Sequence, residues 1–225
     1  MAKFSKSGGM LFTQISSGIY RGKKLALPAF SSTRSTKSIV KGSFFDTWRA
    51  ELRGAAFIEC FGGSGAMALE ALSNGAKNVY AIEKDAAAHK IMRKNFEFFG
   101  LGANAILGDC FERLPEILHD LQANMDAHSA VNLSKSHTVN SGENSVSDPA
   151  RRVFIYLDPP FAIRQGFGEI YERVLALIAR LGSAQCELLI AIEHMSELEL
   201  SPKIGDFALL KSRKFGATTM SYYAK

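Results

Sequence analysis

The sequence predicts an α/β fold: a doubly wound sheet of seven strands whose last hairpin is antiparallel, preceded by a short N-terminal β-hairpin and helix. From residue 55 onward, apolar runs of strand length alternate with segments of helical spacing, which is typical of a sheet covered by helices on both faces. The chain has 225 residues, of which 47% are hydrophobic, enough for one ordinary core. We therefore expect one main domain, residues 51–225, preceded by a basic extension, residues 1–50.

The extension is predicted to contain a hairpin and a helix. Residues 11–27 alternate weakly in hydrophobicity around Gly18 and Gly22, which favours two short strands joined by a turn. Residues 38–52 have the spacing of a helix. The apolar residues able to share the inner face of that helix are Ile39, Phe44, Phe45 and Trp48.

The main domain begins with a strand, a turn, a helix and a second strand. The strands of the sheet are expected at residues 55–60, 78–83, 105–107, 153–157, 187–192, 207–210 and 217–223. The helices are expected at residues 66–73, 85–99, 111–121 and 169–181. Asp85 is the predicted N-cap of the second of these helices, and Gly100 ends it.

Residues 122–150 interrupt this alternation. They contain six Ser and four Asn among 29 residues and have hardly any apolar spacing. We expect a flexible, solvated polar insertion there rather than an element of the sheet.

Charge is distributed unevenly along the chain. The first 45 residues hold eight basic residues and no Asp or Glu, whereas the remaining 180 hold 19 basic and 22 acidic residues. A basic arm on a slightly acidic body is typical of enzymes that capture nucleic acid through its phosphates at one place and react with it at another. A solvated basic surface without a partner is the alternative.

The cysteines and the hydropathy limit the class of protein further. Cys60, Cys110 and Cys186 lie far apart and form no C-x-x-C pair, so we expect buried thiols rather than a metal site or disulfides. No stretch has the length and hydropathy of a membrane span, and the N-terminal residues lead into Gly and Ser rather than into an apolar signal core. We expect a cytoplasmic protein that acts as a monomer.

A glycine-rich turn follows the first strand of the domain. The segment Glu59-Cys60-Phe61-Gly62-Gly63-Ser64-Gly65 ends that strand and opens a helix, where the backbone can approach a ligand without obstruction by Cβ atoms. Glu83, at the end of the next strand, is placed to hold a ribose hydroxyl. This pattern fits a nicotinamide dinucleotide as well as other adenosine cofactors, so by itself it leaves the cofactor open.

Asp158-Pro159-Pro160-Phe161 follows the apolar strand at residues 153–157. Two successive prolines hold the backbone extended and leave a carbonyl facing the cleft. Asp158 and the Pro159 carbonyl can each accept one N–H of an exocyclic amine, which favours a tetrahedral nitrogen whose lone pair points toward an incoming methyl group. Phe161 offers a ring on which an extruded base can stack. The loop therefore predicts methyl transfer to an amine of a nucleic-acid base.

These segments resemble the successive motifs of the class I S-adenosylmethionine-dependent amino-methyltransferases. More narrowly, residues 33–45 resemble the N-terminal signature of the RsmD-type 16S rRNA guanine-N2 methyltransferases. Residues 18–25 and 211–223 resemble the opening hairpin and the last strand of that family. The positions that depart from the residues usual in the family are Ser35, Lys41, Gly42 and Glu59.

The resemblance implies a Rossmann-like methyltransferase sheet, S-adenosyl-L-methionine as cofactor, and the N2 amine of a guanine in 16S rRNA, free or in the assembling small subunit, as substrate. The cofactor contacts that it implies are Glu59, Phe61, Gly62, Gly63, Gly65, Glu83, Lys84, Asp109 and Cys110. The catalytic guanine site that it implies consists of Asp158, Pro159, Pro160 and Phe161. The predicted RNA contacts are Arg21, Lys23, Lys24, Arg34, Thr36 and Lys41.

Other interpretations use some of the same residues. An adenine-N6 DNA methyltransferase, or another RNA or DNA amino-methyltransferase, would use the same Pro-Pro loop, but recognition of a duplex sequence normally needs a further region. A nicotinamide-dependent oxidoreductase would also have a glycine-rich turn, but its chemistry does not require the Asp158 loop. A non-catalytic RNA-binding module would require neither the turn nor the loop. His194 is expected to be structural. Lys211, Arg213 and Lys214 are expected to be either RNA contacts or a solvated edge.

Overall fold

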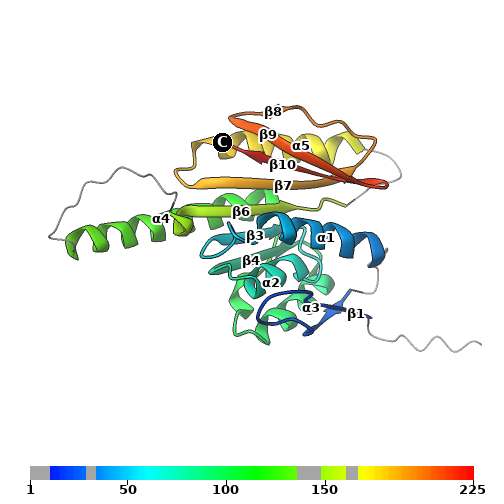
Figure 1. Cartoon of the computed structure of the whole chain (residues 1–225), viewed down its shortest axis with the longest axis horizontal. Coiled ribbons are helices and arrows are strands. Elements are labelled where there is room, and N and C mark those ends of the chain that lie inside the picture. Colours follow the sequence, from blue (N-terminus) through cyan, green and yellow to red (C-terminus); the bar gives the residue numbers. More distant parts are fainter. Residues whose placement is uncertain (1–10, 29–33, 136–147, 161–166) are drawn as a thin grey trace, which may run out of the picture.

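An eight-stranded sheet organises the computed structural model, which describes residues 11–28, 34–135, 148–160 and 167–225 (Figure 1). The strand order is β5-β4-β3-β6-β7-β10-β9-β8. The strands are β3 (Ala56–Cys60), β4 (Asn78–Glu83), β5 (Ala105–Leu107), β6 (Arg152–Leu157), β7 (Glu187–Met195), β8 (Lys203–Ile204), β9 (Phe207–Phe215) and β10 (Thr218–Ala224). The first five strands in this order, β5, β4, β3, β6 and β7, are parallel to one another. The last three, β10, β9 and β8, each run antiparallel to the neighbouring strand.

The doubly wound sheet with its antiparallel C-terminal hairpin confirms the predicted fold class. The predicted number of seven strands is wrong, because the sheet has eight. The additional strand, β8, has only two residues, Lys203 and Ile204, which is too short to produce a recognisable hydrophobic period.

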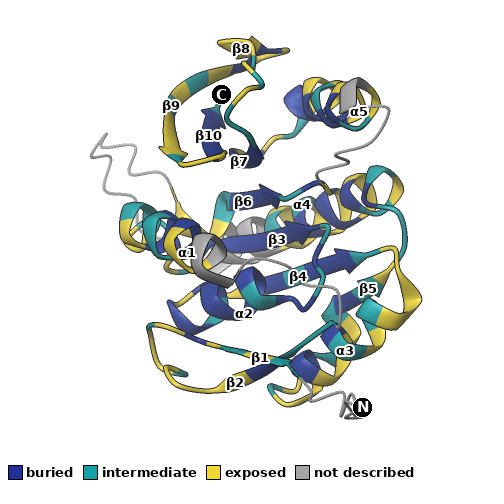
Figure 2. Ribbon diagram, turned by 90° about the vertical axis from the view of Figure 1, so that its right-hand side faces the viewer, coloured by how far each residue is buried: buried dark blue, intermediate teal, exposed yellow. Residues whose placement is uncertain are grey.

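Helices cover both faces of the sheet (Figure 2). The α-helices are α1 (Arg34–Trp48), α2 (Ala66–Ser73), α3 (Ala86–Glu97), α4 (Cys110–Lys135) and α5 (Phe167–Arg180). Short 3₁₀ helices are η1 (Gly102–Asn104), η2 (Pro149–Arg151) and η3 (Leu181–Ser183). Helices α1, α2 and α3 contribute to the core on one face, and α4 and α5 to the core on the other. In the described part of the chain, no helix has both the length and the apolar character needed to cross a membrane.

The central strands are buried on both faces, which explains their mostly apolar sequences. Every residue of β3 is buried, with Phe57 in the core under α1 and Ile58 in the core under α4 and α5. The next residue that points the same way as Phe57 is Glu59, because side chains alternate along a strand. A carboxylate is thereby placed on the face of the sheet that α1 covers.

Helix α1 packs on this face through its aromatic residues. The Phe44 ring lies 5.8 Å from the Phe57 ring and 5.7 Å from the Tyr156 ring, both in edge-on geometry. The prediction that Ile39 shares this inner face is wrong, because Ile39 is 61% exposed. Val40 takes the inner position instead, since it lies one helical turn before Phe44 and is 1% exposed.

Helix α4 is longer than the sequence predicts. It was expected to end at residue 121, with a flexible insertion after it, but it continues to Lys135. No Gly or Pro occurs between residues 122 and 135 to end it, and its side interacts with the following segment through an ion pair of 3.2 Å between Asp126 and Arg151. Residues 136–147, the middle of the predicted insertion, lie outside the described residues.

The N-terminal hairpin is a separate two-stranded sheet, as predicted. Strands β1 (Leu11–Gln14) and β2 (Lys24–Leu27) are antiparallel, with Leu11 opposite Leu27. The segment between them docks on α2, where the Ile19 N–H donates to the Ser73 carbonyl at 2.9 Å. Gly18 has a φ of 77°, and a Cβ atom there would lie 1.9 Å from the same carbonyl oxygen. Glycine is therefore required at the point where the hairpin contacts α2.

A buried carboxylate on α2 attaches the hairpin to the domain. Glu70 is 0% exposed and accepts the backbone N–H groups of Ser16 and Ser17 at 2.8–2.9 Å. It also accepts both serine hydroxyls and the ammonium of Lys41, at 2.7 Å. Burial alone would raise the pKa of Glu70, but the hydrogen bond and charge of Lys41, with the Ser16 amide, lower the pKa below its ordinary value.

We predict that Glu70→Gln destabilises the fold by about 3 kcal/mol at neutral pH, because Lys41 loses its buried partner. A carboxyl group whose pKa folding lowers stabilises the protein at neutral pH, and this stabilisation is lost as the pH falls through the folded-state pKa. The difference in unfolding free energy between wild type and variant should therefore shrink on acidification, as measured by urea denaturation across the acidic range.

Glu97→Gln is the matched control for this prediction. Glu97 forms an exposed ion pair of 3.0 Å with Arg93 on α3, and its loss should change the unfolding free energy by about 0.5 kcal/mol or less. Equal effects of the two substitutions would contradict the role given to Glu70.

Candidate active site

The glycine-rich turn and the Asp158 loop meet at the carboxyl ends of two neighbouring parallel strands. Strands β3 and β6 pair in register, with Cys60 opposite Leu157. The next residues, Phe61 and Asp158, are therefore adjacent at one edge of the sheet. Ligands of doubly wound sheets bind at this edge, outside the carboxyl ends of the strands.

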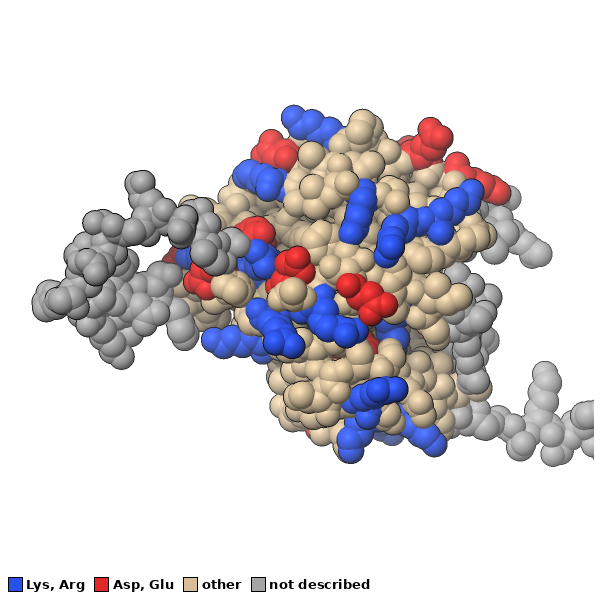
Figure 3. Space-filling model, in the orientation of Figure 1, with Lys and Arg blue, Asp and Glu red and all other residues tan. Residues whose placement is uncertain are grey.

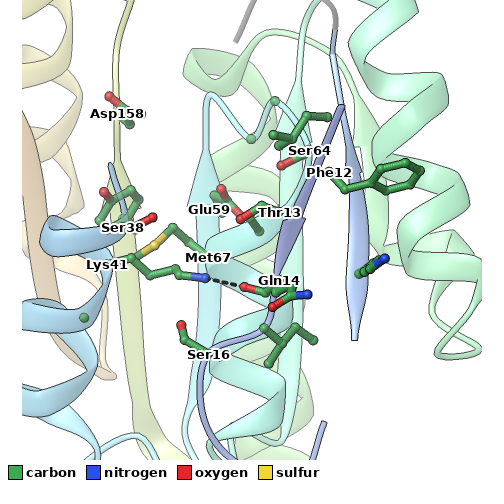
Figure 4. Close-up of a pocket in the computed structure, with 18 of the residues that line it drawn as sticks. Phe12, Thr13, Gln14, Ser16, Ser38, Lys41, Glu59, Ser64, Met67 and Asp158 are labelled. Carbon is green, nitrogen blue, oxygen red and sulfur yellow. Dashed lines mark hydrogen bonds between the residues drawn. The ribbon is translucent and has the colours of Figure 1, made fainter. Parts of the chain in front are cut away.

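A cavity of about 830 Å³ opens at this edge (Figure 4). The sheet contributes Glu59, Tyr156, Asp158 and Glu193, and the glycine-rich turn contributes Phe61, Gly62, Gly63 and Ser64. The hairpin contributes residues 12–16, Arg21, Gly22 and Lys24, and α1 contributes Ser38, Lys41 and Gly42. Segments far apart in the sequence thus enclose one cavity.

The turn has a tight backbone that depends on glycine at specific positions. Gly63 and Gly65 have φ values of 54° and 74°, and Phe61, with φ of 59°, is a non-glycine residue in the left-handed region. A Cβ atom on Gly65 would lie 2.4 Å from the Phe96 ring, whereas a Cβ on Gly63 would meet nothing within 4 Å. Gly65 is therefore needed for packing, while the Gly63 backbone faces open space that a ligand could occupy.

Two carboxylates hold the turn in place. Glu83 accepts the Gly63 N–H at 2.7 Å with one oxygen and the Asp85 N–H at 2.7 Å with the other. Glu59, 6% exposed, accepts the Ala68 N–H at 2.8 Å in the first turn of α2. These bonds fix the carboxylates beside the N-terminus of a helix, a place suited to polar ligand groups.

The other predicted cofactor residues lie at neighbouring strand ends but do not line this cavity. Asp109 pairs with Lys84 at 2.9 Å and lies 3.7 Å from Arg173. Burial acts to raise the pKa of Asp109, but hydrogen bonds from Lys84 and the Phe111 amide, with the charges of Lys84 and Arg173, together lower the pKa. Cys110 is 2% exposed and packs in the core under α4. Glu83, Lys84, Asp109 and Cys110 are thus not among the residues that line the cavity, although Glu83 bonds to Gly63, which does line it.

The Asp158 loop is described in part. Asp158 is half-buried and lines the cavity, Pro159 is buried, and Pro160 is exposed. Phe161 lies outside the described residues. The catalytic roles predicted for the four residues stay predictions.

The residues predicted to contact RNA fall into three groups. Arg21 and Lys24 line the cavity from the hairpin, and Lys23 lies over the exposed Phe98 ring at 5.2 Å. Arg34 and Thr36 lie in the first turn of α1, where the structure describes the backbone alone. The third group is Lys41, whose position differs from the expected one.

Lys41 does not face solvent as an RNA contact would. It is 9% exposed, and its ammonium donates to Glu70 at 2.7 Å and to the Gln14 carbonyl at 2.9 Å (Figure 4). The expectation of an RNA contact is corrected by this geometry, because the charge of Lys41 is satisfied inside the protein. Its place in the sequence gave no sign of burial.

The structure also brings residues into the cavity that the sequence did not single out. Tyr156 donates a hydrogen bond of 2.6 Å to Glu193, and both are buried. Their sequence signal is a polar group in an otherwise apolar strand, as at Glu59. Phe12 and Gln14, on β1, could not be found this way, since only the docking of the hairpin places them at the cavity.

The remaining candidates, His194 and the three cysteines, are buried in the fold. His194 contacts the Met195 carbonyl at 2.9 Å and the Ser221 hydroxyl at 2.8 Å, and burial lowers its pKa. Cys60, Cys110 and Cys186 are free and buried. Among the described residues, no group of three or more His, Cys, Asp or Glu side chains could hold a metal ion.

The C-terminal basic residues lie against α1 rather than forming a separate patch. The Lys211 ammonium lies 4.7 Å from the Trp48 ring, and Arg213 donates to the Ser43 hydroxyl at 2.8 Å. Figure 3 shows Lys and Arg side chains spread over this face with Asp and Glu between them. This mixed distribution favours a solvated surface over a continuous RNA-binding stripe at this place.

Comparison with known families gives a match along nearly the whole chain. The model of a family described as Conserved hypothetical protein 95 matches residues 13–120 and 109–224. The chain belongs to this family. Curated relatives that are named as rRNA methyltransferases confirm the predicted resemblance to the RsmD-type rRNA methyltransferases.

Two curated relatives illustrate the match. "Putative rRNA methyltransferase YlbH" of Bacillus subtilis is 26% identical over 212 residues, which cover 94% of this chain and 98% of that protein. "Ribosomal RNA small subunit methyltransferase D" of Escherichia coli is 37% identical over 82 residues, covering 36% of this chain and 41% of that protein.

Solved structures confirm the fold. "Putative methyltransferase yhhF from Escherichia coli" superposes with a TM-score of 0.65 at 22% identity, covering 95% of this chain and 98% of that one. The Thermus thermophilus 16S rRNA N2 G1207 methyltransferase RsmC, solved with AdoMet and guanosine, superposes with a TM-score of 0.60 at 16% identity. This match covers 96% of the present chain and 50% of the other.

We predict that Glu83→Gln loosens the glycine-rich turn. The side-chain NH₂ group of the glutamine would replace one of the two accepting oxygens, so the N–H of either Gly63 or Asp85 would lose its acceptor. We expect this loss to lower the free energy of unfolding by about 1–3 kcal/mol. Amide hydrogen exchange at Gly63 should become faster, while exchange in the core of β3 changes only by the global loss of stability. Unchanged protection of the Gly63 amide would contradict the anchoring role of Glu83.

Proposed function

We propose that this protein is a small-subunit rRNA methyltransferase that transfers a methyl group from S-adenosyl-L-methionine to the N2 amine of a guanine in 16S rRNA. The observation that carries the proposal is the meeting of the glycine-rich turn and Asp158 in one cavity, at adjacent ends of β3 and β6. The names of the curated relatives support rRNA as the substrate. The guanine N2 position rests on the resemblance of the N-terminal segment and on the name of the RsmC structure.

The charges of the cavity fit S-adenosyl-L-methionine, which carries a sulfonium and an ammonium group. Glu59 lines the cavity on the sheet side, and the Gly63 backbone faces open space beside it. Opposite charges attract strongly where water is partly excluded. The methionine part would contact Glu59, Phe61 and the backbone of Gly62–Gly65, and the bound cofactor supplies an electrophilic methyl group.

The adenosine part would extend toward the ends of β4 and β5. Glu83 lies at the end of β4 and would accept the ribose hydroxyls. Asp109, with Cys110 beside it, would contact the adenine, and Lys84 already pairs with Asp109 across this region. The RsmC structure, a methyltransferase of the same fold solved with AdoMet, supports this choice of cofactor.

Asp158 would act on the amine of the base. Its carboxylate and the Pro159 carbonyl accept the two N–H groups, which directs the nitrogen lone pair toward the methyl group. The nitrogen becomes acidic only as it acquires positive charge, so a carboxylate beside it stabilises the transition state electrostatically and can take up the released proton. Phe161 would stack on the extruded guanine.

The hairpin would hold the RNA beside the cavity. Arg21 and Lys24 line the cavity from the hairpin, where a phosphate next to the target nucleotide could contact them. Arg34 and Thr36, at the start of α1, would lie near the cofactor or the extruded base. The substrate would be 16S rRNA or the assembling small subunit, and we propose that the protein acts as a cytoplasmic monomer.

We predict that Asp158→Ala reduces methyl transfer at least about a hundredfold, since it removes a group that acts in the transition state. The affinity for S-adenosyl-L-methionine should change little, because Asp158 contacts the amine of the target base and not the cofactor. Transfer of a labelled methyl group to 16S rRNA measures the first quantity, and calorimetric titration measures the second. Equal losses in both would contradict the assignment of Asp158.

Removal of the positive charges of Arg21, Lys23 and Lys24 should weaken RNA binding and reduce its salt dependence, by about one unit of slope per lost phosphate contact. Filter binding at several salt concentrations measures this slope. Neutralising the exposed Arg180 and Lys203, at the far end of the sheet, is the control. A slope that changes equally in both variants would show that the hairpin is not the RNA-binding face.

The product identifies the position of the methyl group. We expect rRNA from cells that lack this gene to be missing one N2-methylguanosine in 16S rRNA, and the purified protein to restore it. Nuclease digestion followed by mass spectrometry measures both. A restored methyladenosine, or a restored methyl group on another guanine atom, would contradict the N2 assignment.

A further inference from the structure

Four polar side chains lie in two adjacent rows on the face of the sheet that α1 covers. Glu59 on β3 pairs with Tyr156 on β6, and Tyr156 pairs with Ala191 on β7. Side chains two residues apart on a strand share a face, which places Asp158 above Tyr156 and Glu193 above Ala191. Glu59, Tyr156, Asp158 and Glu193 all line the cavity.

Glu193 is held in place by Tyr156, which lies in the adjacent row. It is 3% exposed, and one of its oxygens accepts the Tyr156 hydroxyl at 2.6 Å. Burial, with the charges of Glu193 and Asp158, raises the pKa of Tyr156 well above its ordinary value, so its hydroxyl stays protonated as a donor. The carboxylate of Glu193 therefore has a fixed orientation at the cavity wall.

The methyl transfer proposed above assigns no role to Glu193, although burial of a carboxylate costs free energy. A carboxylate can accept several hydrogen bonds at once, so the contact with Tyr156 is compatible with a further one from a ligand. Glu59 lies on the side of the glycine-rich turn, where the cofactor is placed. Glu193 lies on the opposite side of Asp158, because β7 and β3 flank β6.

Guanine carries a second donor on the edge that Asp158 would hold. Its N1–H is next to the carbon that bears the N2 amine, and enzymes recognise an extruded base by such hydrogen bonds along its Watson–Crick edge. Purines with an unprotonated N1, such as adenine and 2-aminopurine, present a lone pair at that position. A carboxylate can accept a hydrogen bond from the N1–H of guanine, whereas its oxygens repel the lone pair of an unprotonated N1.

We propose that Glu193 accepts the N1–H of the target guanine and thereby selects guanine over purines with an unprotonated N1, an inference that rests on the proposed function. Tyr156 is a positioning residue that holds the Glu193 carboxylate toward the base. Selection by one such contact corresponds to a preference of about tenfold to a hundredfold.

2-Aminopurine is the probe that tests this inference, since it has the N2 amine but no N1–H. The methylated guanine is first mapped in 16S rRNA, and small-subunit RNA is then prepared with either guanine or 2-aminopurine at that position. The wild-type protein should methylate the guanine RNA about tenfold to a hundredfold faster. Glu193→Gln keeps the shape of the side chain and offers an N–H to the unprotonated N1, so the preference should fall to within about threefold of unity.

Matched variants separate selection from general damage. Glu59→Gln should weaken S-adenosyl-L-methionine binding and leave the guanine preference as in the wild type. Tyr156→Phe should lower the preference to a value between those of the wild type and Glu193→Gln, because the carboxylate remains but loses its fixed orientation. The ratio of two rates is insensitive to a partial loss of folded protein, which affects both substrates equally.

The outcomes distinguish this inference from the function on which it rests. If the wild type forms N2-methylguanosine but Glu193→Gln keeps the full guanine preference, Glu193 does not contact N1 and the inference is overturned while the function stands. Loss of S-adenosyl-L-methionine affinity in Glu193→Gln, with an unchanged preference for guanine, overturns it as well. If the wild type forms no N2-methylguanosine, the proposed function fails and the inference fails with it.

Discussion

The parallel pairing of β3 with β6 is the constraint on which the candidate site depends. It places the residue after Cys60 next to the residue after Leu157, so a glycine-rich turn and an Asp-Pro-Pro loop about a hundred residues apart in sequence face one cavity. Both strands are apolar and buried on both faces, so a shift of register would expose their cores or bury their polar ends. The geometry of the site is thus stabilised by the hydrophobic core beneath it.

The second constraint is the carboxylate of Glu70. It binds two backbone amides, two hydroxyls and the ammonium of Lys41, and it connects α1, α2 and the hairpin. A two-stranded hairpin is marginally stable by itself in water, so this buried network accounts for its fixed place at the cavity. The hairpin is therefore a wall of the site and not a loosely attached basic arm.

The walls of the cavity have opposite charges. Carboxylates project from the sheet, at Glu59, Asp158 and Glu193, whereas Arg21 and Lys24 face the cavity from the hairpin. A cationic cofactor and a polyanionic substrate can approach such a cavity from different sides without competing for the same groups. In the proposed function, this arrangement would separate recognition of the methyl donor from recognition of the RNA backbone.

The sequence by itself determined the class of fold, most element boundaries, the glycine-rich turn and the place of Asp158. These features follow from hydrophobic period and turn chemistry, which act over a few residues. Only the tertiary structure decided the burial of Lys41, the exposure of Ile39, the length of α4 and the entry of β1 and Glu193 into the cavity. The physical reason is that each of these depends on a contact with a distant segment, such as Glu70 with Lys41 and Tyr156 with Glu193, and no local pattern encodes such a partner.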